Sequence, residues 1–170
     1  VVVLPAAQRM GGGLSLLDLR KQKNVEIPDG VREIGERWFK SSEVESVEIP
    51  ASVTEVQREA FHNCKMLRKV VFAENSRLKT IGSRCFADSW IEEITIPASV
   101  TAIRESAFEE CAALAKVTFQ DASKLEEIGG YCFINTALDE ITVPRSVVRI
   151  ETCAFHNCER LRKISFQACS

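Results

Sequence analysis

The side chains best suited to chemistry in this sequence are seven cysteines, and their spacing limits what they can do. Cys64, Cys111 and Cys158 are 47 residues apart, and so are Cys85 and Cys132. The odd number does not suit a disulfide framework, and no Cys-x-x-Cys pair typical of zinc sites occurs. The regular interval favours free thiols that occupy repeating positions in a packed core, where they behave as small hydrophobic groups.

Two further cysteines fall outside these repeating core positions. Cys153 replaces an outward polar residue and Cys169 stands in a predicted turn. We therefore predict that these two are the most reactive thiols, because thiol reactivity depends on exposure.

The two histidines are also poor candidates for a catalytic or metal site. His62 and His156 both lie in Phe-His-Asn-Cys segments, four repeat units apart. At about 4.8 Å per unit they are about 19 Å apart, so they cannot share a proton or a metal ion. We expect both to be exposed on the back of the molecule. No phosphate-binding loop, metalloprotease helix or nucleophile elbow is present, and the carboxylates fall at solvent-facing positions. We predict no catalytic residues, no cofactor and no metal, and an enzyme is disfavoured.

The interval between the cysteines belongs to an internal repeat. Apolar-x-apolar triplets recur every 22 to 24 residues, and two unit types alternate, so that the full period is a pair of 47 residues. The units begin at Val25, Val47, Val70, Ile94, Val117, Ile141 and Ile164. A period of this length indicates a solenoid, in which each unit buries its apolar side against its neighbours.

All nine phenylalanines obey the repeat. Three lie 47 residues apart at the third strand position, and the other six alternate at intervals of 22 and 25. The first column is Phe72, Phe119 and Phe166, and the second is Phe39, Phe61, Phe86, Phe108, Phe133 and Phe155. Proline ends the triplet in the shorter units, where the missing N–H stops the strand. The columns predict ladders of like residues along a continuous core.

The motif Ile/Val-x-Ile-Pro-x-Ser-Val, followed by Ile-Gly, Ala-Phe-x-x-Cys and Leu, closely resembles the BspA-like class of leucine-rich repeats. The resemblance covers about residues 25–170. It implies an α/β solenoid: a right-handed leucine-rich-repeat stack with a parallel β-sheet on one face and short helical or 3-10 turns on the other.

The domain organisation follows from the same motif. We expect six full repeats and the strand of a seventh over residues 25–170, and a degenerate first repeat or N-terminal cap over residues 1–24, with a strand at residues 2–5. The segment 164–170 matches 117–123, so we expect either that the native array continues past residue 170 or that a neighbour covers its end.

Charge and hydropathy exclude two classes of partner. The 170 residues carry a formal net charge of −2, and no apolar stretch is longer than five residues. A near-neutral chain lacks the basic field that nucleic acid requires, and a membrane span needs about 20 apolar residues. We expect no nucleic acid and no membrane insertion by this segment.

The predicted outer face of the sheet is the best candidate for partner binding. The two residues before each strand alternate in sign between units, and the next outward position holds hydroxyl and β-branched residues. The candidate residues are Glu45, Glu48, Arg68, Lys69, Val71, Glu92, Glu93, Thr95, Lys116, Thr118, Asp139, Glu140, Thr142, Arg162 and Lys163. The alternation also fits a self-complementary ladder that sets the strand register, so both interpretations stay open.

Both tryptophans stand outside the phenylalanine columns. Trp38 replaces the small residues of later units and is expected to fill a wider first layer. Trp90 lies in a turn that we expect to be open to solvent, which makes it a candidate binding anchor, against partial packing on the adjacent turn.

The family resemblance implies a secreted or cell-surface protein that adheres to host proteins, including extracellular matrix, or to other cells. The alternative is an intracellular scaffold, because free thiols persist most easily in the cytosol.

Overall fold

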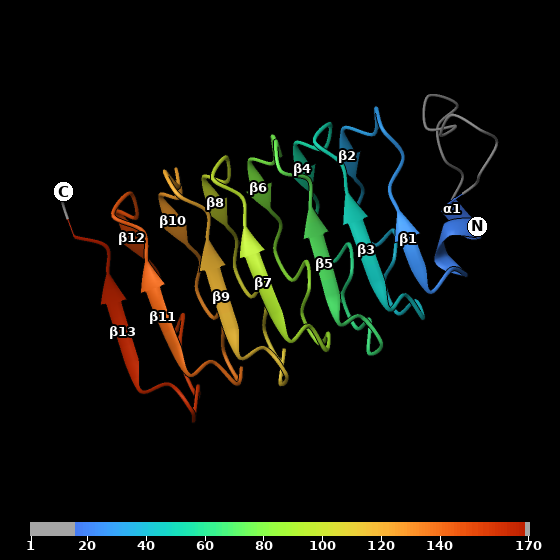
Figure 1. Cartoon of the computed structure of the whole chain (residues 1–170). Helices are drawn as coiled ribbons and strands as arrows, with labels where there is room; N and C mark the ends of the chain where they lie inside the picture. The colour runs from blue at the N-terminus through green and yellow to red at the C-terminus, as the bar shows by residue number, and fades with distance from the viewer. Residues whose placement is uncertain (1–15, 169–170) are drawn as a thin grey trace.

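Residues 16–168 of the chain are described by a computed structural model, which shows a stack of similar turns with one strand of a long sheet in each (Figure 1). The expected strand at residues 2–5 and the thiol of Cys169 lie outside the described residues. One short helix, α1 (Leu16–Arg20), precedes the first strand, and its residues Leu16 and Leu19 are buried.

The long sheet contains seven parallel strands in chain order. Its members are β1 (Asn24–Glu26), β3 (Ser46–Ile49), β5 (Lys69–Phe72), β7 (Glu93–Ile96), β9 (Lys116–Phe119), β11 (Glu140–Val143) and β13 (Lys163–Phe166). Val47 pairs with both Val25 and Val70, and Ile141 pairs with Ile164, so the predicted unit starts lie in register. The parallel sheet expected from the repeat is confirmed.

A second sheet runs along another side of the stack. It consists of six two-residue strands, also parallel: β2 (Glu33–Ile34), β4 (Glu55–Val56), β6 (Thr80–Ile81), β8 (Ala102–Ile103), β10 (Glu127–Ile128) and β12 (Arg149–Ile150). The side chains of Ile34, Val56, Ile81, Ile103 and Ile128 point into the core and are fully buried. Each turn therefore pairs with its neighbours along two lines of strands.

The predicted helical or 3-10 turns on the back are wrong, because the Ala-Phe-x-x-Cys segments form β-turns. Glu59 and Asn63 have φ angles of 54° and 58°, in the left-handed region, and equivalent residues of the other units do the same. The N–H of Phe61 donates to the carbonyl of Cys85 at 2.8 Å, and the N–H of Asn63 donates to that of Ala87 at 2.8 Å. These donors face the next unit, whereas a helix would direct them to carbonyls of its own turn.

The phenylalanine ladder forms the centre of the stack. The rings of Phe39 and Phe61 stack at a centroid distance of 4.9 Å, and the series continues to Phe155 with distances of 5.3–5.5 Å. The five rings before Phe155 are fully buried. The other phenylalanine column is less buried: Phe72 and Phe119 are only partly covered, and Phe166 is 64% exposed. The ladder from Phe39 to Phe155 is therefore the main apolar contribution of the aromatic residues.

Trp38 fills the first layer, as expected, and is buried. The absence of a side chain at Gly35 makes this possible, because an added Cβ would lie 2.2 Å from Nε1 of the indole.

Candidate binding surface

The outer side of the seven-stranded sheet, called the sheet face, presents the fifteen residues that the sequence predicts for partner binding. Along each four-residue strand the first and third side chains point outward and the second and fourth point into the core. The fifteen candidate residues lie on this face, and all are exposed except Glu45 and Thr118, which are partly exposed. The structure thus brings them onto one surface.

The row of residues two places before the core position of each strand, called the loop row, is paired within the chain. Lys23 Nζ lies 2.7 Å from Glu45 Oε1, and Arg68 Nη1 lies 3.1 Å from Glu92 Oε1. A third ion pair joins Arg162 Nε to Asp139 Oδ1 at 2.8 Å. These are the cross-strand contacts that alternating charges predict, and exposed pairs of this kind contribute about 0–1 kcal/mol each.

The next row, called the charged row, consists of Lys69, Glu93, Lys116, Glu140 and Lys163, the first residues of their strands. Each lies directly beside a residue of opposite sign on the neighbouring strand. Within residues 16–168 none of these five side chains makes an ion pair or a hydrogen bond. The charges of this row therefore face solvent uncompensated by direct contact.

Hydroxyl groups of the third strand position hydrogen-bond to one another. Thr95 Oγ1 lies 2.8 Å from Thr118 Oγ1, and Thr142 Oγ1 lies 3.0 Å from Ser165 Oγ. Earlier strands hold Glu26, Glu48 and the half-exposed Val71 at this position.

Trp90 lies in the loop before β7 and is 47% exposed. The guanidinium carbon of Arg68 lies 5.7 Å from the centroid of its ring, a cation–π distance. Arg68 also pairs with Glu92, so the three side chains form one cluster, the Arg68–Trp90 cluster, at the border of the sheet face. The sequence predicted each residue separately but contained no signal that they meet.

Two shallow grooves lie on the sheet face. One, of about 410 Å³, is centred on β5, β7 and β9 and is lined by Lys69, Val71, Glu93, Thr95, Lys116 and Thr118, among others. The second, of about 630 Å³, lies at the N-terminal end beside Glu26, Asp29 and Glu48. Both are open depressions on the predicted binding surface.

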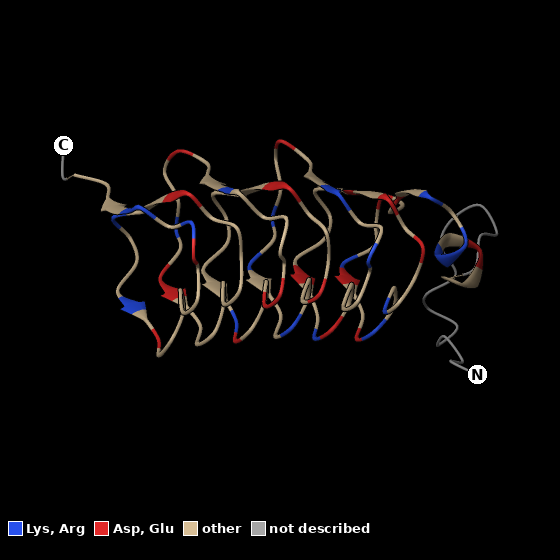
Figure 2. Cartoon of the chain, turned by 90° about the horizontal axis from the view of Figure 1, so that it is seen from below, with Lys and Arg blue, Asp and Glu red and all other residues tan. Residues whose placement is uncertain are grey.

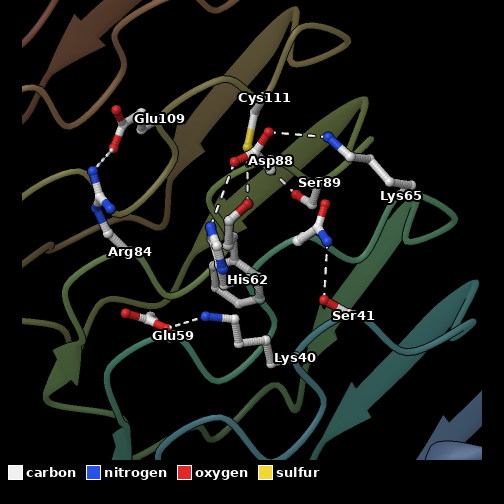
Figure 3. A network of polar contacts seen from close by, with 12 residues as sticks. Lys40, Ser41, Glu59, His62, Lys65, Arg84, Asp88, Ser89, Glu109 and Cys111 are labelled. Carbon is white, nitrogen blue, oxygen red and sulfur yellow. Dashed lines mark hydrogen bonds and ion pairs between the residues drawn. The ribbon is translucent and has the colours of Figure 1, made fainter.

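A buried carboxylate on the back was not predicted. Glu59 is 4% exposed and accepts hydrogen bonds from Arg37 Nε at 2.9 Å and Arg58 Nε at 3.3 Å. A third hydrogen bond comes from Lys40 Nζ at 2.6 Å (Figure 3). The bonds from Arg37 and Lys40 hold its pKa well below the usual range for glutamate. A carboxylate saturated by three cations is unsuited to act as a general base. The sequence did contain a signal for this ion pair, because Arg37 and Glu59 occupy the same position in successive units.

His62 corrects the expectation that both histidines are exposed. Its side chain is only 20% exposed, and Nε2 lies 3.5 Å from Asp88 Oδ2 of the next unit (Figure 3). Burial, followed by the nearby charge of Lys40, lowers its pKa. His156 is exposed, because it belongs to the last turn and no later described turn covers it.

The core cysteines are free, as the spacing predicted, and they also donate hydrogen bonds. The thiols of Cys64, Cys111 and Cys158 donate to the carbonyls of Phe39, Phe86 and Phe133 at 2.9, 3.1 and 3.0 Å. Burial raises the pKa of Cys111 to about 11. Within the described part of the chain, no group of three or more His, Cys, Asp or Glu side chains is arranged to hold a metal ion.

Thiol labelling of the native protein should separate these cysteines. We expect the exposed Cys153 to react with iodoacetamide at least about a hundredfold faster than the buried thiols of Cys64, Cys85, Cys111 and Cys132. The reagent reaches the buried thiols only when the protein unfolds locally or globally. Mass spectrometry of timed samples measures the rates. Equal labelling of Cys111 and Cys153 in folded protein would contradict the burial of the core thiols.

No helix within residues 16–168 has the length and apolar character needed to cross a membrane.

Comparison with known proteins identifies the repeat. The family model described as BspA type leucine rich repeat region matches in six copies, over residues 17–115 and 79–169. Among curated proteins, none matches this sequence significantly.

Several solved structures are similar. The pneumococcal vaccine antigen PcpA is 28% identical, with a TM-score of 0.79 over 87% of this chain and 41% of that protein. A leucine rich cell surface protein from Faecalibacterium prausnitzii A2-165 is 29% identical, with a TM-score of 0.59 over 86% of this chain and 48% of that protein. The leucine rich repeat protein of T. pallidum, at 21% identity and a TM-score of 0.57 over 86% and 70% of the two chains, shares the fold. The chain spans less than half the length of the first two proteins.

Proposed function

This chain belongs to the BspA-type leucine-rich repeat family, and from that premise we propose that it is a protein-recognition module that binds a partner protein at a cell surface through its sheet face. The partner is a host protein, such as a component of the extracellular matrix, or a protein on another cell. The role is adhesion rather than catalysis.

The Arg68–Trp90 cluster is the observation that carries this proposal. Tryptophan and arginine are the side chains most enriched at energetically dominant positions of protein interfaces. Here a guanidinium lies over a half-exposed indole. They stand close to the groove that Lys69 and Val71 line, since Lys69 follows Arg68 directly in the chain. An aromatic anchor beside a groove with charged and hydroxyl side chains suits the centre and rim of a protein interface.

The similar solved structures support a location at the cell surface. The F. prausnitzii protein is a cell surface protein by name, and PcpA is a vaccine antigen. Both share more than a quarter of their aligned residues with this chain. We extend the surface location to this chain on that likeness.

An intracellular scaffold is the second candidate, and the free thiols favour it. Cys64, Cys85, Cys111 and Cys132 are reduced and buried. Reduced cysteines persist most easily in the cytosol, although burial also protects them elsewhere.

Binding to a panel of extracellular matrix proteins and intact host cells tests the proposal. We expect saturable binding that falls at least about tenfold in Trp90→Ala and in the double variant Arg68→Glu with Lys69→Glu, because both changes act on the same part of the sheet face. Circular dichroism and thermal unfolding establish that each variant is folded.

A matched control reverses two charges away from the sheet face. Lys79 and Lys124 are exposed, and Lys79 immediately precedes β6 of the second sheet. The variant Lys79→Glu with Lys124→Glu should bind like the unmodified protein. Equal loss in this control, or full binding by the folded sheet-face variants, would remove the sheet face as the binding surface. Absence of binding to every extracellular target would favour the scaffold.

A further inference from the structure

The charged row is the part of the sheet face whose charged side chains make no ion pair within residues 16–168. Its five side chains alternate as Lys, Glu, Lys, Glu and Lys on successive strands from β5 to β13, about 4.8 Å apart. The loop row on one side forms ion pairs, and the hydroxyl groups on the other side bond to each other. The charged row has no such partners within the described residues.

We infer that the charged row binds a second copy of this chain, sheet face to sheet face, about a twofold axis parallel to the strands. This rests on the proposed use of the sheet face for recognition and adds another copy of this chain as a partner of that face. A half-turn about such an axis reverses the order of the strands but keeps each row opposite the same row of the other copy. The charges that meet therefore depend only on which strands the axis separates.

An axis between β7 and β9 places four of the five members of the row opposite a residue of the other sign, and Lys163 faces Ser46 of the second copy. Glu93 then faces Lys116 of the second copy, and Lys69 faces Glu140 of the second copy; symmetry repeats both contacts. An axis through a strand would instead place Glu93 against Glu93. The alternation of charge therefore favours registers whose axis lies between two strands and excludes registers whose axis runs through a strand.

The neighbouring rows agree with the same axis. In the loop row, Arg68 faces Asp139 of the second copy and Glu45 faces Arg162 of the second copy. In the third strand position, Thr95 faces Thr118 of the second copy, and Val71 faces Thr142. No like charges meet in any of the three rows, and six of the seven strands overlap, from β3 to β13.

The middle of the sheet is close to flat. Seen nearly along the strands, the seven-stranded sheet follows an almost straight line along one side of the stack, and two loops project past that line (Figure 2). Two sheets packed face to face keep their strands within about 30° of each other, which concentrates the contact near the axis. The groove lined by Lys69, Glu93 and Lys116 lies at that position.

The spacing of the charges selects a sheet as the partner. An extended peptide laid across the strands presents side chains on one side every 6.6–6.8 Å or so, which loses register with a 4.8 Å row after about two contacts. A uniformly acidic or basic partner meets repulsion at every second strand. A second copy has the same spacing and the complementary order.

Exchanging the charges of the row tests the inference in a way that separates it from general surface effects. The positive variant carries Glu93→Lys and Glu140→Lys, and the negative variant carries Lys69→Glu, Lys116→Glu and Lys163→Glu. Sedimentation equilibrium measures self-association of each folded protein at low and physiological salt.

We expect the unmodified chain to dimerise in a concentration-dependent way that weakens as salt screens the row. Each variant alone should associate at least about tenfold more weakly, and an equimolar mixture of the two should recover association as a heterodimer. The variant Lys79→Glu with Lys124→Glu should dimerise like the unmodified chain.

An unmodified chain that is monomeric at every concentration at low salt would overturn the inference, and so would variants that dimerise normally or fail to recover on mixing. If such a monomer still binds the matrix and cell panel, the proposed function stands and only the identity of the partner is wrong.

Discussion

Replacing Phe108 with alanine should lower the free energy of unfolding by about 3–5 kcal/mol, the largest stability loss that we expect from one side chain in this chain. Phe108 is fully buried and stacks between Phe86 and Phe133 at centroid distances of 5.5 and 5.4 Å. Its removal creates a cavity between two rigid rings that cannot both move to fill it. Urea denaturation followed by circular dichroism measures the change.

Phe166→Ala is the matched control for this substitution. It deletes the same atoms from a ring that is 64% exposed, so the loss should be below about 1 kcal/mol. Similar losses at Phe108 and Phe166, or an unchanged midpoint for Phe108→Ala, would contradict the ladder as the main source of stability.

Adding a single methyl group at Gly129 should cost up to about 3 kcal/mol. A Cβ at this position would lie 2.5 Å from the amide nitrogen of Glu105 and 2.6 Å from the carbonyl carbon of Arg104. Both atoms belong to the backbone of the preceding unit, so relief requires two turns of the stack to separate. Thermal and urea unfolding of Gly129→Ala measure the loss.

The adjacent Gly130 provides the comparison. Its added Cβ would meet the carbonyl oxygen of Thr152 at 3.1 Å, a contact that a shift of a few tenths of an ångström relieves. Gly130→Ala should therefore be clearly less harmful. A larger loss of stability for Gly130→Ala than for Gly129→Ala would show that the close backbone contact at Gly129 does not determine the spacing between turns.

The strands of the long sheet were predictable because their signal is local. An apolar-x-apolar triplet places two side chains in the core and one outside, and Pro50, Pro97 and Pro144 mark the strand ends. Repetition at a constant interval then fixes the register, and Val47 pairs with Val25 and Val70 as the spacing requires.

The turns on the back were mispredicted because their determinant is a backbone conformation. Arg37, Glu59 and Arg84 adopt positive φ without a residue type that favours it. Asn63, Asp88 and Asn135, in the second such column, were the available signal, since Asn and Asp tolerate the left-handed region better than other side chains. The two-residue strands of the second sheet were too short for an alternation to appear.

The sheet face could be predicted as a surface but not as a set of contacts. Alternation along a strand decides that Lys69 and Glu93 point outward, which the structure shows. The contact of Arg68 with Trp90 depends on how two long side chains turn across neighbouring units, and sequence spacing does not encode that.

The charge alternation on the sheet face follows the two unit types, because the longer units end in Glu93 and Glu140 and the shorter units end in Lys69, Lys116 and Lys163. A gene duplication or deletion of one unit would place two lysines or two glutamates side by side in the row. Gain or loss of a complete 47-residue pair preserves the order. Recombination therefore preserves the order of charges on the sheet face only when it adds or removes an even number of units.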